Sequence, residues 1–154
     1  MLFRSDELVF YDITASSDKR NIMLDVVSEV AKQIFIPFSV GGGIRTLEDI
    51  NALLRSGVEK INVNSAAVKL PTLIDECAGA IGRQNTVLSM DVRRVESMAS
   101  CPSGFEIVIN GGRTPMGLDA VAWAKEGVAR GAGELRSEEH TSELQSPCNL
   151  VCRL

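Results

Sequence analysis

The sequence of 154 residues contains one histidine, His140, one tyrosine and one tryptophan, and only 5% of its residues are aromatic. Histidine is the side chain that exchanges protons most readily near neutral pH and the commonest metal ligand, so a site built from several histidines is excluded. Acidic residues outnumber basic ones by 20 to 16, and the net charge of −4 argues against broad nucleic-acid binding. No apolar run approaches the roughly 18 residues that suggest a membrane span. We therefore expect neither nucleic acid nor membrane as a partner.

The two ends of the chain differ from its middle. Residues 136–154 have no hydrophobic period and resemble a translated sequencing-adapter oligonucleotide. The start MLFRS supports this, because LFRS can be encoded as CTC TTC CGA TCT, and the reverse complement of that string translates as RSEE, residues 136–139. We therefore expect residues 1–5 and 136–154 to be non-native, the latter a disordered or non-native tail, and the native domain to span residues 6–135. A natural disordered tail is the alternative.

This division changes the inventory of reactive groups. His140 falls in the expected tail, and so do Cys148 and Cys152, whose C-x3-C spacing then gives no support to a zinc site. Cys77 and Cys101 remain, and Cys77 lies on the apolar stripe of an expected helix, where a buried thiol is the simpler role. Two thiols and no signal peptide fit a reducing compartment, so we expect a cytoplasmic protein without a metal.

Strand-like and helix-like segments alternate through the middle of the chain. Runs rich in β-forming residues occupy 6–13, 36–40, 60–64 and 85–92, and segments with helical spacing occupy 16–34, 47–56, 71–81 and 118–129. Thr46 is suited to cap the second of these helices, Gly57 to end it, and Pro71 to open the third. Four βα units in a row indicate a parallel sheet with helices outside it.

The length of each unit, roughly 25 residues, fits a (βα)8 barrel of about 250 residues. A doubly wound sheet is the alternative. The sequence has no GxGxxG after the first strand-like run, which weakens a dinucleotide-binding fold.

Glycines and polar residues gather where the expected strands end. Asp12 ends the first strand, Gly41 to Gly43 the second, Asn64 and Ser65 the third, and Asp91 the fourth. Barrel enzymes place their sites at the carboxyl ends of strands, so these residues are candidates for one site. The three glycines fit either a tight turn with positive φ or a phosphate resting on exposed amides. Ser65 fits a helix cap as well as an anion ligand, and Asp91 alone fits a loop cap.

Five segments together resemble the cyclase subunit of imidazole glycerol phosphate synthase. They are DELVFYDITASSDKR, IPFSVGGGIRTLED, KINVNSAAV, VLSMDVRRV and GGRTPMGLDAVAWA, and the resemblance covers residues 6–134 in the family's order and spacing. It implies a partial (βα)8 TIM barrel of about four consecutive βα units, the family's strands two to five with the following helix. It also implies an enzyme of histidine biosynthesis without a cofactor. That enzyme converts a ribotide carrying two phosphates, using ammonia from a glutaminase subunit or domain.

The resemblance also implies roles for individual residues. Asp91 matches a catalytic aspartate of the family. A carboxylate there can move protons during amine addition and ring closure. Gly42, Gly43, Asn64 and Ser65 match a phosphate site of the family. Asp12 matches a carboxylate that supports the site. Part of a charged ring at the barrel floor, where ammonia enters beside the glutaminase, is matched by Glu7 and Lys60. An ordinary solvated salt bridge is the alternative for that pair.

The match begins at the family's second strand and breaks off entering the sixth. The other catalytic aspartate, on the first strand, and the second phosphate site, on the last strands, have no counterpart in this sequence. We therefore expect this polypeptide to be inactive as it stands. The alternatives are the sister phosphoribosyl-formimino isomerase of the same pathway and a non-catalytic phosphate-binding fragment.

Overall fold

The protein is described by a computed structural model that covers residues 6–12, 24–96, 99–139 and 149–153. Its strands are β1 (Leu8–Tyr11), β2 (Phe38–Gly41), β3 (Lys60–Val63), β4 (Thr86–Arg94), β5 (Phe105–Ile109), β6 (Thr114–Asp119), β7 (Glu134–Glu139) and β8 (Asn149–Arg153). Its helices are α2 (Leu24–Ala31), α3 (Leu47–Arg55), α4 (Ser65–Lys69), α5 (Thr72–Ile81), the 3-10 turn η1 (Arg83–Asn85) and α6 (Ala120–Arg130).

The strands form one sheet, and its parallel strands follow one another in chain order. Strands β1, β2, β3 and β4 pair in parallel in that order, and β7 joins the other side of β4, also in parallel. A doubly wound sheet would reverse its strand order at a switch point, and this sheet does not. The parallel part of the fold is therefore that of a partial (βα)8 barrel, as the sequence predicts.

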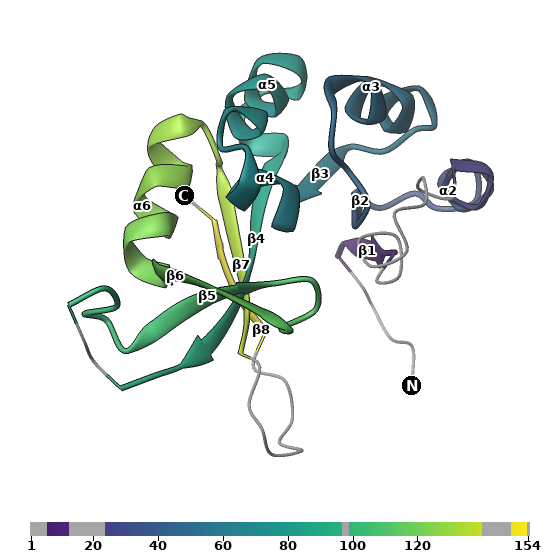
Figure 1. The fold of residues 1–154 in the computed structure, drawn as a ribbon. Coiled ribbons are helices and arrows are strands. Elements are labelled where there is room, and N and C mark those ends of the chain that lie inside the picture. Colours follow the sequence, from purple (N-terminus) through teal and green to yellow (C-terminus); the bar gives the residue numbers. More distant parts are fainter. Residues whose placement is uncertain (1–5, 13–23, 97–98, 140–148, 154) are drawn as a thin grey trace, which may run out of the picture.

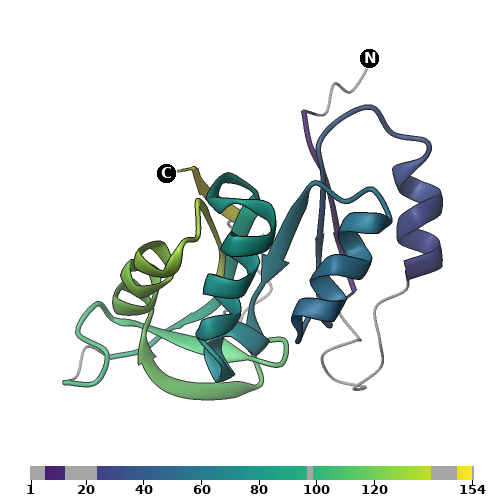
Figure 2. The ribbon, with the colours of Figure 1, turned by 90° about the horizontal axis from the view of Figure 1, so that it is seen from above.

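The helices lie outside this sheet. Figure 1 shows α2, α3, α5 and α6 as an arc around the parallel strands, and Figure 2 shows the same arc turned by 90°. The hairpin of β5 and β6 pairs antiparallel with the carboxyl half of β4, through Asp91 to Arg94, and β8 pairs antiparallel with β7. None of the helices in the described ranges is long and apolar enough to cross a membrane.

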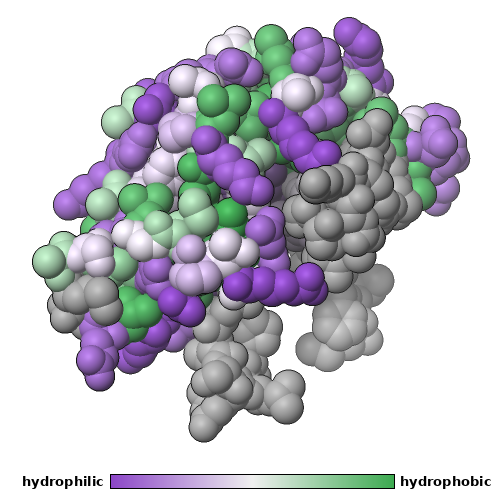
Figure 3. All heavy atoms as spheres, in the orientation of Figure 1, coloured by the Kyte–Doolittle hydropathy of each residue, from purple (hydrophilic) through white to green (hydrophobic). Residues whose placement is uncertain are grey.

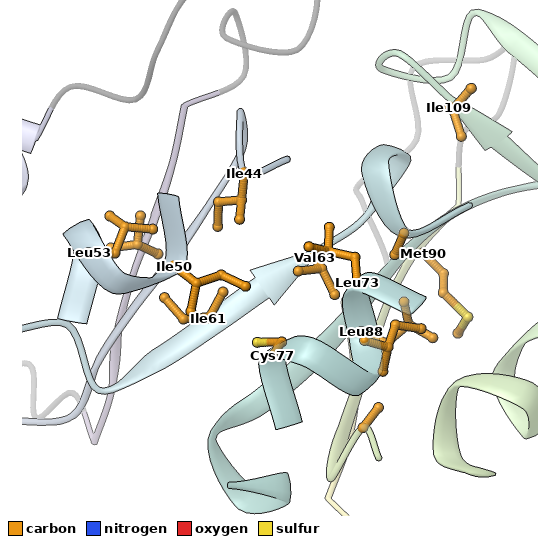
Figure 4. Packing of buried hydrophobic residues seen from close by; sticks show 14 of the residues in the cluster. Ile44, Ile50, Leu53, Ile61, Val63, Leu73, Cys77, Leu88, Met90 and Ile109 are labelled. Carbon is orange, nitrogen blue, oxygen red and sulfur yellow. The ribbon is translucent and has the colours of Figure 1, made fainter. Parts of the chain in front are cut away.

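The hydrophobic core fills the layer between the helices and the outer face of the sheet. Figure 4 shows Ile50 and Leu53 of α3 above Ile61 of β3, and Leu73 and Cys77 of α5 beside β3 and β4. These five side chains have no measurable exposure. Complete burial of an aliphatic side chain of this size stabilises the fold by about 1.5–3 kcal/mol, so this layer holds the sheet and helices together.

The inner face of the sheet is polar, unlike the outer face. Outward positions of β2 and β3 are apolar, whereas Ser39, Lys60 and Asn62 alternate with them on the inner side. On β4, Ser89 and Asp91 occupy the inner positions. Because side chains alternate across a strand, this pattern turns a row of polar groups toward the concave side.

Local sequence signals explain where the elements begin and end. Thr46 caps α3 as expected, since its side chain accepts from the amide of Asp49 and the Asp49 carboxylate accepts from the amide of Thr46. This reciprocal pair is a capping box. Gly57 follows the C-cap of α3 with φ of 91°, and Pro71 stands at the N-cap of α5.

The expected helix at 118–129 begins later in the structure. Leu118 belongs to β6, and α6 starts at Ala120 because Asp119 caps it, accepting from the amide of Ala122. The β5–β6 hairpin occupies the excursion after Asp91 that the periodicity did not assign. The helix expected over residues 16–34 is described from Leu24 onward, and residues 16–23 lie outside the described ranges.

The expected domain limit at residue 135 falls inside β7. Residues 136–139 continue this strand against β4 and are therefore not irregular. Whether residues 1–5 and 136–154 are non-native stays a prediction. Residues 1–5, 140–148 and 154, with His140 and Cys148 among them, lie outside the described ranges.

Candidate functional site

A cavity of about 930 Å³ occupies the concave side of the sheet. Residues from β1, β3, β4, α4 and β7, from the turn after β2 and from the hairpin tip line it. They include Asp12, Gly42, Gly43, Asn64, Ser65, Asp91 and Glu7. All the expected site residues except Lys60 therefore meet at one cavity. The face of the molecule shown in Figure 3, in the orientation of Figure 1, carries hydrophilic and hydrophobic residues side by side.

Two of the three glycines are required by the backbone. Gly42 has φ of 90° and Gly43 has φ of 71°, a region that side chains rarely adopt. A Cβ on Gly42 would also collide with the carbonyl oxygen of Asp12. The turn interpretation is therefore correct for this segment. It does not exclude the phosphate interpretation, because the amides of both residues donate to no backbone acceptor within the described residues.

Asn64 and Ser65 lie beside this glycine turn. Asn64 occupies the N-cap position of α4, but its side chain makes no capping hydrogen bond. Ser65 is the first residue of α4, and its Oγ accepts from the amide of Asn110 at 3.2 Å. The capping interpretation of Ser65 is therefore wrong. Its hydroxyl instead fixes the tip of the β5–β6 hairpin over the cavity.

The two aspartates occupy different walls of the cavity. Asp12 follows β1, is 5% exposed, and its amide donates to the carbonyl of Gly41 at 3.0 Å. Asp91 lies on β4, opposite Val108 of β5 and Glu138 of β7. The structure thus brings Asp91 to the same cavity as the glycine turn and Asn64.

A closed ring of four charges lies at the amino ends of the strands. Lys60 Nζ lies 3.1 Å from Glu7 and 2.8 Å from Glu134, and Arg136 lies 2.6 Å from Glu7 and 2.9 Å from Glu134. Glu7 and Lys60 are therefore two members of a charged ring, whose other two members, Glu134 and Arg136, the sequence analysis did not name. With side chains between 2% and 13% exposed, the ring is mostly buried, so a solvated salt bridge does not describe it.

The ring shifts the pKa values of Glu134 and Arg136 toward their charged forms. Burial raises the pKa of Glu134, but hydrogen bonds from Lys60 and Arg136 outweigh burial and leave that pKa below its ordinary value. Burial likewise lowers the pKa of Arg136, and its hydrogen bond to Glu134 reverses the sign of the shift. Both cations and both carboxylates thus stabilise one another.

Sequence reasoning missed several polar residues of the cavity. Tyr11 and Ser89 line it and form a hydrogen bond, and Asn62 lines it from β3. Strand alternation could have found them, since Tyr11 is an even number of positions from Glu7, Asn62 from Asn64, and Ser89 from Asp91. Glu134 and Arg136 were missed because the ring forms only when β7 pairs with β4.

Cys77 and Cys101, the cysteines whose side chains the structure describes, do not line this cavity. Cys77 is buried as expected, and burial raises its pKa to about 11, so its thiol stays protonated at neutral pH. Within the described ranges, no group of three or more His, Cys, Asp or Glu side chains is placed to hold a metal ion.

A parallel sheet with sequential neighbours, helices outside and a cavity on its concave side, lined by polar groups from the carboxyl ends of its strands, defines part of a (βα)8-barrel protein. The model of the family described as "Histidine biosynthesis protein" matches residues 4–137. The chain belongs to this family, and the resemblance drawn from the sequence is confirmed.

Curated relatives agree with this family. The protein named "Imidazole glycerol phosphate synthase subunit HisF" from Desulfatibacillum aliphaticivorans is 63% identical over 130 residues, which cover 84% of this chain and 50% of the relative. Its namesakes from Syntrophobacter fumaroxidans and Desulfosudis oleivorans are 62% and 61% identical over 131 residues, 85% of this chain and 51% of each relative. The chain thus spans about half the length of the curated relatives it matches.

Proposed function

We propose that this chain is the portion of an imidazole glycerol phosphate synthase cyclase that carries one phosphate site and one acid–base carboxylate. The observation that supports this most is the gathering of Gly42, Gly43, Asn64, Ser65 and Asp91 at one cavity, although they come from β4 and from the segments that follow β2 and β3. The names of the relatives supply the reaction class.

The phosphate site consists of the glycine turn and the loop after β3. Two amides without a backbone acceptor among the described residues, at Gly42 and Gly43, are suited to receive phosphate oxygens. Arg45 and Lys69 also line the cavity and contribute positive charge near the turn. A small phosphate ester is therefore the ligand that this end of the cavity favours, with Asp12 a supporting carboxylate.

Asp91 is the acid–base residue of the proposal. In the complete enzyme it would move protons while ammonia adds to a bis-phosphorylated ribulosyl-formimino aminoimidazole carboxamide ribotide and the imidazole ring closes. The products would be imidazole glycerol phosphate and aminoimidazole carboxamide ribotide. Its place on the wall of the cavity that Asn64 and Ser65 also line supports this role.

The partner of this chain would be a glutaminase subunit or domain that supplies ammonia. The charged ring of Glu7, Lys60, Glu134 and Arg136 supports a docking floor, because it lies at the amino ends of the strands, whereas the glycine turn and Asn64 follow the carboxyl ends of β2 and β3. We further propose a cytoplasmic enzyme of histidine biosynthesis, a lyase by class. The sister isomerase is less well supported, because the relatives at 61–63% identity bear the cyclase name.

We expect the chain to bind phosphate without turnover, since it spans half of its relatives and the resemblance places a second catalytic aspartate on a strand without a counterpart here. The test adds the bis-phosphorylated substrate and excess ammonium to the purified chain and measures imidazole glycerol phosphate. Calorimetry with inorganic phosphate runs in parallel. Binding with no product supports the proposal. Turnover that Asp91→Asn abolishes would contradict the expected inactivity, and absence of phosphate binding would contradict the phosphate site.

A further inference from the structure

A pair of hydroxyl groups spans the middle of the cavity. The hydroxyl of Tyr11, on β1, lies 3.0 Å from Oγ of Ser89, on β4, and both residues line the cavity. The bond connects residues 78 positions apart and crosses the faces of β2 and β3. Tyr11 remains 42% exposed, so its ring is available to a ligand in the cavity.

The sequence makes room for this arrangement at Gly41. A Cβ there would stand 2.5 Å from Cε1 of Tyr11 and 2.9 Å from Cβ of Asn62. Any side chain at position 41 would therefore displace the Tyr11 ring. Gly41 is not among the glycines with positive φ, so its role is to leave space rather than to adopt a special backbone conformation.

The wall around the pair is polar and incompletely satisfied. Oδ1 of Asn62 and Oδ1 of Asn64 are buried and have no hydrogen-bond partner among the described residues. An unpaired buried acceptor costs free energy, and each such group in a folded protein calls for an explanation. Asn62 is 1% exposed and its amide nitrogen donates to Ser39, so its unpaired oxygen cannot turn to solvent. These acceptors favour a ligand that donates hydrogen bonds.

We propose that Tyr11 and Ser89 form a second binding point, which takes hydroxyl groups of a phosphate monoester whose phosphate occupies the Gly42–Gly43 turn. This inference rests on the phosphate site of the proposed function. Tyr11 is the strand partner of Gly41, which immediately precedes the turn, and its ring lies against Gly41. The two binding points therefore lie on adjoining parts of one cavity wall, and a polyol chain would join them.

The chemistry of the pair favours a hydroxyl-bearing chain over an apolar one. Each hydroxyl is one donor and two acceptor positions, and their mutual bond uses one donor. The pair therefore keeps one O–H and several lone pairs for a ligand. An apolar chain that fills the cavity would exclude water from these hydroxyls and from Oδ1 of Asn62 and Asn64, and would give them no hydrogen-bond partner.

The test compares two esters of equal length, glycerol 3-phosphate and 1-propyl phosphate, with inorganic phosphate as the third probe. Binding to the full chain is measured by calorimetry. We expect glycerol 3-phosphate to bind more tightly than propyl phosphate. Tyr11→Phe keeps the ring over Gly41 and removes only the hydroxyl. It should weaken glycerol 3-phosphate binding roughly five- to tenfold, the value of one hydrogen bond, and leave the other two probes unchanged.

Ser89→Ala should reproduce this selective loss, and Ser56→Ala is the matched control, because Ser56 bonds the carbonyl of Ala52 at the end of α3 and does not line the cavity. Equal affinities of the wild type for the two esters would overturn the inference alone. So would a loss in Tyr11→Phe that is the same for all three probes, since that indicates a structural role. Failure of all three probes to bind would overturn the phosphate site and this inference together.

Discussion

Tyr11 and Gly41 face each other across the β1–β2 pair so closely that the ring occupies the position of a side chain at residue 41. Gly41→Ala should therefore lower the free energy of unfolding by about 1–3 kcal/mol, the typical cost of overpacking. Gly41→Ala should cost less stability in the Tyr11→Ala background than in the wild type, because the clash with the ring is then absent. Urea unfolding of the four proteins of this cycle measures the coupling, and strict additivity would contradict the contact.

Gly42 is constrained by conformation as well as by space. Its φ of 90° and the collision of an added Cβ with the Asp12 carbonyl predict that Gly42→Ala destabilises the chain by about 2–4 kcal/mol. Gly79→Ala is the control, since Gly79 lies inside α5 with no atom within 4 Å of an added Cβ. That change should stabilise the chain by about 0.5–1 kcal/mol. Thermal melts that rank the two variants in the opposite order would contradict the glycine-turn geometry.

The charged ring should depend on Arg136. Arg136→Met keeps most of the side-chain length but leaves Glu7 and Glu134 with Lys60 as their one remaining ring cation, so we expect a loss of about 2 kcal/mol. Arg130→Met is the matched control. Arg130 also pairs with two carboxylates, Asp75 and Glu126, but at a surface where solvent screens such pairs, so they contribute little to stability. Equal effects of the two changes would contradict a buried ring.

The ring also predicts a dependence on pH. The pKa of Glu134 in the folded chain lies below its ordinary value of 4.5, so its contribution to stability is complete above about pH 4.5 and is lost as the pH falls through the folded value. Glu134→Gln has no such proton to bind. Between about pH 6 and pH 3 the urea midpoint of the wild type should therefore fall further than that of the variant. Parallel pH profiles would show that Glu134 carries no shifted pKa.

Much of the fold follows from the sequence because periodicity and caps act locally. Thr46, Gly57 and Pro71 mark real helix ends, and the apolar stripe of α5 buries Leu73 and Cys77 as its spacing predicts. The β5–β6 hairpin could not be predicted in the same way. Its left-handed tip at Asn110 is fixed by a hydrogen bond to Ser65, 45 positions away, which no local pattern contains.

The candidate site was predicted where it depends on strand ends and missed where it depends on pairing across the sheet. Asp91 lies in the carboxyl half of β4 and Gly43 follows β2, and parallel strands bring their carboxyl ends to one edge. The partners of Lys60 could not be inferred, because Glu134 and Arg136 reach it only through the pairing of β7 with β4. Arg136 was assigned to the tail from its sequence context, although its side chain closes the ring.

The central proposal is that the glycine turn and the loop after β3 together bind a phosphate group. Titration of the isotope-labelled chain with inorganic phosphate, followed through the backbone amide resonances, tests it most directly. We expect saturable shifts at Gly42, Gly43, Asn64 and Ser65, with amides of α2 unmoved. Shifts that are absent, or that are spread over basic residues far from the cavity such as Lys32, would contradict it.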